Sequence, residues 1–316
     1  MRFVSRSSLL LASLLVACGA SAAEPIASPA ASGGEVTGNA GVGGERYEVR
    51  FARRHQPGQA WALSVVAEDT QTRVITVPGQ PPQQDVETTR SELSGIYRVV
   101  EVDAQGSVRR ASFDPQRLVV DRGQGAAVVG LPAHLVLEYA GDGVIRAADG
   151  TPLSDETQET LDDLLHVGSS ASQRWDDSVL APDGPQPVGA EWSIDAARAA
   201  EQLGDIGVSI RPGGIGGRMR LIGVEEVGGA SCLALRAELV ARDIGLDRAP
   251  EGSRVERSEL RARMEGMLPR DASLPTLDQR MRFEMVISLA VDTPLGTGTV
   301  SVSARHDSHE QRTMLR

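Results

Sequence analysis

The strongest constraint on the fold is an alternation of apolar and polar residues with a period of two, which recurs along the chain. In its longest instance, over residues 281–291, Met, Phe, Met, Ile, Leu and Val occupy every second position. A turn at 292–296 leads into 300–305, where the alternation resumes. A period of two places the apolar side chains of a strand on one face. Because the connection is short, we expect the two segments to form an antiparallel hairpin.

Further strands and a few helices are expected around this hairpin. Shorter alternating runs begin at Tyr47 and Trp61. Three segments carry helical signals: 154–166 has a capping serine and an apolar face, 254–268 follows the start of a Ser-x-x-Glu capping box, and 194–203 is rich in alanine. The predicted fold is therefore mainly β: two facing or packed antiparallel sheets, in a form like a half-barrel, with two or three helices.

The two halves of the chain share some of their motifs. The Gly-x-x-Trp motif at 58–61 returns at 189–192, and 95–103 aligns with 217–225, both runs starting at a glycine. The Pro- and Asp-rich stretch 176–187 between the halves is expected to be a loop. These matches favour a duplicated β unit whose curved sheets face each other across a ligand space. The alternative is that β-rich chains resemble one another by pattern alone.

The N-terminus resembles an export signal. Two arginines precede the apolar run 9–16, which is too short to span a bilayer. The run ends in Leu-Val-Ala-Cys-Gly at 15–19, which resembles the lipobox of bacterial lipoprotein signals. The resemblance implies cleavage before Cys18 and fatty acylation, of the palmitate kind, of its sulfur and its new amino group. Cleavage after Ala22, at an Ala-x-Ala site, is the alternative and leaves a soluble periplasmic protein without an anchor.

Small and polar residues dominate the segment that follows, which therefore buries too little apolar surface to fold. We expect a signal peptide over 1–17, a lipidated and disordered tether over 18–44 and a β-rich head over 45–316, with repeat halves 45–175 and 188–316. The residue after the cysteine is Gly rather than Asp. In a Gram-negative cell the lipobox resemblance then implies the outer membrane, with the head facing the periplasm.

Charge and composition exclude several classes of function. The formal net charge is −11, which argues against nucleic-acid binding, because that affinity comes from cationic side chains on phosphates. All 32 cationic residues are Arg, so every site chemistry that needs a lysine is absent. These include the P-loop, the pyridoxal Schiff base and the Ser-x-x-Lys acyl enzymes. The sequence also lacks the Gly-x-Ser-x-Gly, Cys-x-x-Cys and His-Glu-x-x-His motifs.

The remaining chemical candidates are weak. His306 and His309 belong to a dense His, Asp and Glu run, but on a strand two residues three apart point to opposite faces, so both cannot bind one metal ion. Cys232 has no cation beside it in sequence that would activate a thiol, and we expect it to be a buried strand residue. We therefore predict no metal site and no cofactor.

The order of motifs resembles a family. A Gly-x-x-Trp strand, a strand at 141–147, a Leu-rich helix, Pro-x-x-Val-Gly-x-x-Trp at 185–192 and a Gly-Val-Glu hairpin at 223–232 follow one another. This order is similar to that of uncharacterised exported bacterial β-rich proteins and lipoproteins, over roughly 47–241. The resemblance implies an exported β-rich fold and transfers no catalytic residue.

These observations favour a non-enzymatic module of the cell envelope, held to the membrane by its N-terminal lipid. Its partner is expected to be an apolar ligand or an envelope protein. The candidates for an adaptable apolar groove are Met264, Met267, Met281 and Met285, although core packing explains them equally well. An envelope hydrolase, with a site assembled from distant Asp, Glu and His residues, is the alternative from another class.

Overall fold

The computed structural model describes residues 44–139, 143–167, 177–204, 208–210, 213–246, 253–293 and 295–315. Over these residues the chain is mainly β, with antiparallel strands and three helices. The predicted fold class is thereby confirmed.

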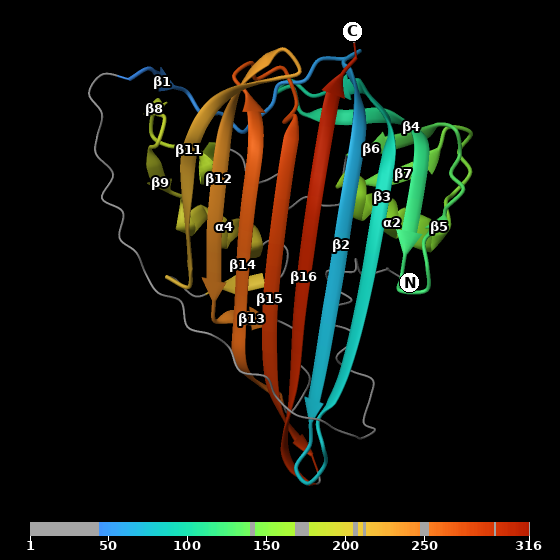
Figure 1. Ribbon diagram of the computed structural model, residues 1–316, viewed down its shortest axis with the longest axis vertical. Helices are drawn as coiled ribbons and strands as arrows, with labels where there is room; N and C mark the ends of the chain where they lie inside the picture. Colours follow the sequence, from blue (N-terminus) through green and yellow to red (C-terminus); the bar gives the residue numbers. More distant parts are fainter. Residues whose placement is uncertain are drawn as a thin grey trace.

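Twelve strands form one large sheet (Figure 1). Along its main path the order is β7 (Val144–Ala147), β6 (Leu135–Glu138), β4 (Val108–Asp121), β3 (Gln83–Val102), β2 (Ala60–Thr76), β16 (Gly296–Met314), β15 (Asp278–Thr293), β14 (Ser253–Pro269), β12 (Ala230–Arg242), β11 (Ile215–Val227) and β9 (Glu191–Ser193). The twelfth strand, β5 (Ala127–Val128), pairs with β4. Two short pairs lie outside this sheet: β1 (Arg46–Tyr47) with β8 (Gln186–Pro187), and β10 (Val208–Ile210) with β13 (Ile244–Leu246).

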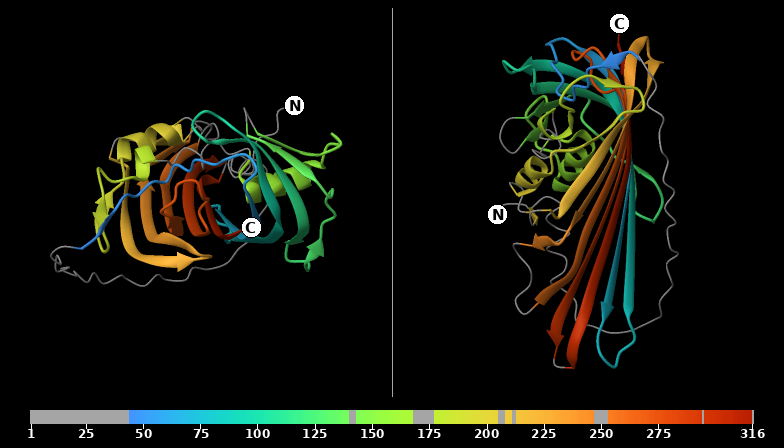
Figure 2. Two further views of the ribbon diagram at one scale, coloured as in Figure 1. Left: turned by 90° about the horizontal axis from the view of Figure 1, so that it is seen from above. Right: turned by 90° about the vertical axis from the view of Figure 1, so that its left-hand side faces the viewer.

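The large sheet is strongly curved. Seen from above, it bends like half of a barrel, so that its two wings face each other across a concave inner face (Figure 2). The facing sheets of the prediction are therefore the wings of one continuous sheet. The predicted hairpin stands at its centre, where β15 and β16 pair in one unbroken register. β16 also pairs with β2, which joins the C-terminal strands to the N-terminal ones.

The two faces of the sheet carry different side chains. Arg and acidic residues alternate on the outer face and pair across strands, as Arg282 does with Asp307 (2.6 Å) and Arg236 with Glu265 (2.9 Å). Exposed pairs of this kind contribute little stability each, and the face that they cover is solvated. The apolar positions of each alternation point to the inner face, where the helices lie (Figure 2).

Two of the helices were expected from the sequence. α2 (Asp155–Leu165) begins after Ser154, whose hydroxyl oxygen accepts a hydrogen bond of 3.2 Å from the Thr157 backbone N–H. α4 (Ala196–Gly204) begins after Asp195, whose carboxylate accepts from two backbone N–H groups of the first turn. α3 (Asp177–Leu180) is a single turn within the stretch expected to be a loop.

The helix predicted over 254–268 is wrong, because this segment is strand β14. It pairs with β15 along nearly its whole length and with β12 over residues 259–269. Its apolar residues Leu260, Met264 and Leu268 are four apart, a spacing that fits a helix and also fits one face of a strand. The ladders on both sides decide between them, since tertiary pairing overrides local helix propensity.

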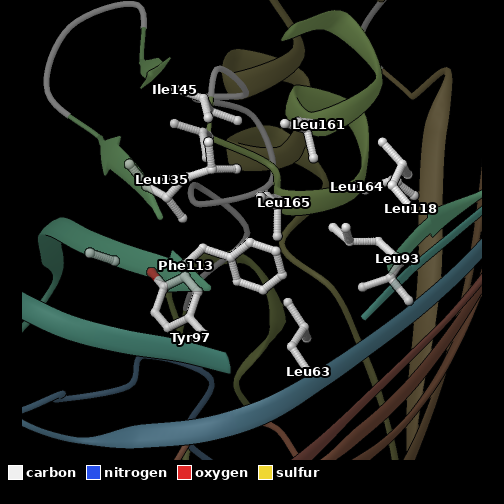
Figure 3. Close-up of a cluster of buried hydrophobic side chains, with 14 of the residues drawn as sticks. Leu63, Leu93, Tyr97, Phe113, Leu118, Leu135, Ile145, Leu161, Leu164 and Leu165 are labelled. Carbon is white, nitrogen blue, oxygen red and sulfur yellow. The ribbon is translucent and has the colours of Figure 1, made fainter. Parts of the chain in front are cut away.

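Three apolar clusters occupy the inner face. The first lies between α2 and strands β2 to β7, where Leu161, Leu164 and Leu165 of α2 point toward the ring of Phe113 and its neighbours (Figure 3). The second lies under α3 and α4 on β11, β12 and β14. The third is smaller and lies at one end of the second, with these buried members: Val49, Leu221, Leu233, Leu235 and Leu268. Each wing of the sheet is thus sealed by its own helix or helices.

The strands that follow the two Gly-x-x-Trp motifs begin in the same way. In each case two backbone hydrogen bonds join the motif to one residue of the neighbouring strand. The N–H of the glycine donates to the carbonyl of that residue, whose own N–H donates to the carbonyl of the residue that follows the glycine. In the first motif Val99 is this residue and bonds with Gly58 and Gln59 (2.9 and 2.9 Å). In the second motif it is Leu221, which bonds with Gly189 and Ala190 (2.7 and 3.0 Å). A register shift also follows Val99 in β3 and Leu221 in β11. The sequence alignment places these two residues at the same position.

Candidate functional site

A band of half-buried side chains crosses the inner face between the two helix-covered wings. We call it the central band and define it by inward-facing residues of β14, β15 and β16: Met264, Met281, Phe283, Met285, His306, Ser308 and Glu310. The strand registers bring these residues together, since Met281 lies opposite both Met264 and Ser308. Phe283 lies opposite His306 in the same way. The band is apolar on the β14 and β15 side and polar on β16.

Three of the four methionines expected to line a groove lie together in this band. Met264, Met281 and Met285 share the inner face of adjacent strands. Met267 lies on the outer face, because it is three residues from Met264 on a strand rather than on a helix. Phe283 completes the apolar part and was missed as a site residue, although it occupies an apolar position between Met281 and Met285 in the alternating run.

The polar side of the band holds a histidine–carboxylate pair. Nδ1 of His306 lies 2.8 Å from Oδ1 of Asp69 on β2. Burial by itself lowers the pKa of His306, but the hydrogen bond to Asp69 and the negative charges of Asp69, Asp163 and Asp307 outweigh it, and the net pKa is raised. The surroundings of His306 therefore stabilise the protonated imidazole relative to the neutral one.

A second histidine approaches the band from the helix side. His166 ends α2 in the left-handed conformation, with φ of 54°. Burial lowers its pKa, and the positive charges of His306 and Arg312 lower it further, while the charge of Glu310 acts in the opposite direction. Their surroundings thus shift the pKa values of His306 and His166 in opposite directions.

Beyond Glu310 the inner face carries a network of polar and aromatic groups. Glu310 and Arg312 form an ion pair of 2.5 Å with side chains only 14% and 22% exposed. Arg312 also donates to the backbone carbonyl of Thr276 (3.0 Å). Nearby, the Tyr97 hydroxyl donates a hydrogen bond to that of Tyr139 (3.0 Å). The charges of Glu310 and Arg312 act in opposite directions on the pKa of both hydroxyls. This network closes the band toward the C-terminal end of β16.

An aromatic stack adjoins the network. The rings of Trp61 and Tyr97 are stacked at 4.7 Å between centroids, and the ring of His55 lies 5.7 Å from that of Trp61. Within the described residues, Nδ1 of His55 and Nε1 of Trp61 are buried without a hydrogen-bond partner. Burial lowers the pKa of His55 to about 4, with help from the charges of Arg312 and Arg53. This imidazole is therefore neutral at neutral pH.

Two cavities lie near the third apolar cluster, where the β11–β12 turn meets the β14–β15 connection. One has a volume of about 190 Å³ and is lined by arginines and by buried leucines of that cluster. The other has a volume of about 380 Å³ and adjoins the turn itself. Arg270 lines both cavities. Sequence reasoning did not identify this region.

The remaining candidates from the sequence are accounted for as follows. His306 and His309 point to opposite faces, as expected of a strand, since His309 contacts Asp278 (3.1 Å) on the outer face. The structure shows no group of three or more His, Cys, Asp or Glu side chains arranged for a metal ion among the residues it describes. Cys232 is fully buried, which raises the pKa of its thiol, and it is the strand residue expected. Cys18 lies outside the described residues.

None of the helices that the structure describes combines the length and the apolar character needed to cross a bilayer. This finding covers the described part of the chain alone.

Comparison with known proteins gives weak matches. No protein-family model and no curated protein matches the chain. Among solved structures, a lipovitellin chain, from a study of its lipid–protein interactions, is 9% identical with a TM-score of 0.35 and matches 83% of this chain. This chain spans only 25% of that lipovitellin chain.

Two bacterial structures are also similar. An outer membrane channel from Pseudomonas putida is 8% identical with a TM-score of 0.20, and the match covers 83% of this chain and 98% of that one. A DUF1329 family protein from Desulfovibrio piger is 11% identical with a TM-score of 0.11, over 76% and 83% of the two chains. At TM-scores below 0.5 these similarities carry no argument, and the functional reasoning rests on the geometry of the inner face.

Proposed function

We propose that this protein is a non-enzymatic module of the bacterial cell envelope whose concave inner face binds an apolar ligand. The observation that carries the proposal is the central band. Three methionines and a phenylalanine lie half-buried on two adjacent strands, β14 and β15, between wings whose own apolar clusters are covered by helices. Of these four residues, Met264 and Phe283 also pack against the second apolar cluster. Apolar surface that stays partly exposed on a concave face is a candidate binding surface. Methionine side chains are flexible and adapt to ligands of irregular shape.

The strands at the two ends of the sheet are short, and a longer free edge lies at residues 83–89 of β3, before its pairing with β4 begins. The edge strands β7 and β9 contain four and three residues. Short edge strands give an added strand few backbone hydrogen bonds. An apolar ligand on the inner face needs no free edge, because it binds by burial of apolar surface.

The His306–Asp69 pair favours a second candidate function, a hydrolase. A histidine oriented by a carboxylate is the arrangement of a general base. Such a pair also needs a nucleophile within hydrogen-bond reach of the imidazole. In the described part of the chain, the His306 imidazole forms its hydrogen bond with Asp69. Hydrolysis of p-nitrophenyl acetate that His306→Ala abolishes would establish this function in place of the first.

Attachment to the envelope belongs to the same proposal. The lipobox resemblance supports cleavage before Cys18 and acylation of that residue, with 18–44 as a tether for the head at 45–316. The identical hydrogen bonding at Gly58 and Gly189 supports a duplication that relates the halves 45–175 and 188–316. In this proposal the head hangs from the outer membrane into the periplasm and holds its ligand between two related wings.

Two variants of the same residue type test the ligand-binding face. Met281→Arg places a charge in the central band, whereas Met267→Arg places it on the outer face of the same sheet. The fluorescent probe N-phenyl-1-naphthylamine should bind the wild-type protein and Met267→Arg equally. We expect Met281→Arg to weaken that binding at least 10-fold, because a buried charge must be desolvated. Equal binding by both variants would overturn the proposal.

A further inference from the structure

The cavity of about 190 Å³ brings together three arginines from two distant parts of the chain. Arg50 and Arg53 come from the segment before β2, and Arg270 follows β14. One acidic side chain, that of Glu48, lines the cavity with them. The whole chain has a formal net charge of −11. A local excess of guanidinium groups on an acidic protein is therefore a specific feature of this cavity.

Arg53 is fixed in place by the backbone. Its Nη1 donates to the carbonyls of Pro269 (2.9 Å) and Asp271 (3.3 Å), Nη2 to that of Arg50, and Nε to that of Phe51 (3.4 Å). All four acceptors are neutral oxygens. Burial lowers the pKa of Arg53 to about 10, while the negative charges of Asp177 and Asp271 act in the opposite direction. The cavity thus contains a partly desolvated cation whose hydrogen bonds all go to neutral backbone oxygens.

The other two arginines are partly exposed, and the guanidinium of Arg270 also lies over the ring of Tyr47, 5.1 Å from its centroid. Arg50 pairs with Glu48 (2.5 Å) and Arg270 with Glu45 (3.5 Å), and both arginine side chains are about half exposed, at 50% and 48%. Exposed ion pairs of this kind are worth about 1 kcal/mol or less. A guanidinium gains more from a desolvated, bidentate contact with a carboxylate or phosphate.

The lining of the cavity also includes apolar side chains. Leu233 and Leu268 line it and are 1% and 4% exposed. Leu268 and Met264 lie on the same face of β14, four residues apart, which corresponds to about 13 Å along a strand. Pockets that enclose a whole drug-sized ligand measure roughly 300 to 1,000 Å³. A cavity of about 190 Å³ therefore suits one polar group rather than a complete amphiphile.

We propose that this cavity binds an oxyanion, a carboxylate or a phosphate, that forms the head of an amphiphile whose chain lies along β14 toward the central band. The part concerning the chain rests on the proposed function, while the oxyanion site stands on the three arginines alone. Arg53 supplies the fixed charge, and Arg50 and Arg270 close on the anion from the rim.

Calorimetry on the full chain with three probes tests the proposal. Dodecyl phosphate carries both head and tail, dodecyl maltoside carries the tail with a neutral head, and inorganic phosphate carries the head alone. The variants are Arg50→Glu and Arg270→Glu. Arg254→Glu is the matched control, because Arg254 is exposed and ion-paired away from the cavity. We expect the two cavity variants to weaken dodecyl phosphate binding about 10-fold or more, since charge-assisted hydrogen bonds are lost. The control should bind like wild type.

The other outcomes separate the two proposals. Equal binding of dodecyl phosphate by wild type and both cavity variants would refute the oxyanion site. If dodecyl maltoside still bound, the proposed function would stand without the oxyanion site. Binding of inorganic phosphate alone, lost in Arg50→Glu and Arg270→Glu, would support the oxyanion site with free phosphate as its ligand and refute the amphiphile. Binding of none of the probes would refute both.

Discussion

Two glycines at matching positions in the wings have no room for a side chain. A Cβ on Gly95 in β3 would lie 2.5 Å from the backbone oxygen of Asp114 and 2.5 Å from Cζ of Phe113. Phe113 is fully buried, so its ring cannot move aside. Neither contact is compatible with an unchanged backbone. The substitution Gly95→Ala therefore forces the β3–β4 pair apart or displaces the ring at the centre of the first cluster.

The equivalent glycine in the other wing meets the same obstacle. A Cβ on Gly217 in β11 would lie 2.8 Å from the backbone oxygen of Glu238 and 2.9 Å from Cδ1 of Ile194. The neighbouring Gly216 has nothing within 4 Å of a Cβ, so Gly216→Ala is the matched control. Overpacking in a well-packed core costs about 1 to 3 kcal/mol. Replacing glycine by alanine within a strand gains about 0.5 to 1 kcal/mol in chain entropy.

We therefore expect Gly95→Ala to lower the free energy of unfolding by about 1 to 2 kcal/mol. Gly217→Ala should lower it less, because the end of the Ile194 side chain can yield. Gly216→Ala should raise it by roughly 0.5 kcal/mol. Urea unfolding followed by circular dichroism measures all three, at an unchanged slope with denaturant. If Gly95→Ala proved as stable as Gly216→Ala, the close packing of β3 against β4 and the argument built on it would be refuted.

Three further predictions concern pH, the helix and the anchor. The pKa of His55 falls to about 4 in the folded protein, from about 6.5, so folding stability should decline as the pH drops from 6.5 toward 4, by at most about 3 kcal/mol from this group. Urea unfolding at pH 7 and pH 4.5 should show a smaller decline in His55→Gln, and an equal decline would exclude His55 as its source. Leu161 of α2 is fully buried, and Leu161→Ala should cost about 2 to 5 kcal/mol in the same assay, whereas a loss below 1 kcal/mol would mean that α2 does not seal its wing. Cys18→Ser should move the protein from the membrane fraction to the soluble periplasm with its head still folded. Mass spectrometry of the wild-type protein should find acyl groups on Cys18, and an unmodified N-terminus at Ala23 would contradict the anchor.

The sequence was most informative where one pattern extended over many residues. The alternation at 281–291 predicted the β15–β16 hairpin, and the capping serine predicted α2. It failed at β14, because Leu260, Met264 and Leu268 fit both periods and only the ladders on either side decide between them. The same ambiguity grouped Met267 with methionines on the other face.

The candidate site could be predicted only in part. Met281 and Met285 were proposed because they share an alternating run, and Met264 was proposed from the apolar stripe of a helix that proved to be β14. His306 and Asp69 lie 237 residues apart and meet only when β16 pairs with β2. The arginine cavity was missed for the same reason, because Arg50 and Arg53 lie close to Arg270 only in the folded protein. Contacts between residues distant in sequence follow from topology, which the local pattern of a single chain does not specify.

Photocrosslinking with a diazirine-bearing fatty acid, mapped by peptide mass spectrometry, tests the central claim most directly. The account predicts crosslinks on inward-facing residues of β14 and β15, above all Met264, Met281 and Phe283, and their loss in Met281→Arg. Crosslinks confined to outer-face residues such as Met267 would contradict it, as would labelling that Met281→Arg leaves unchanged.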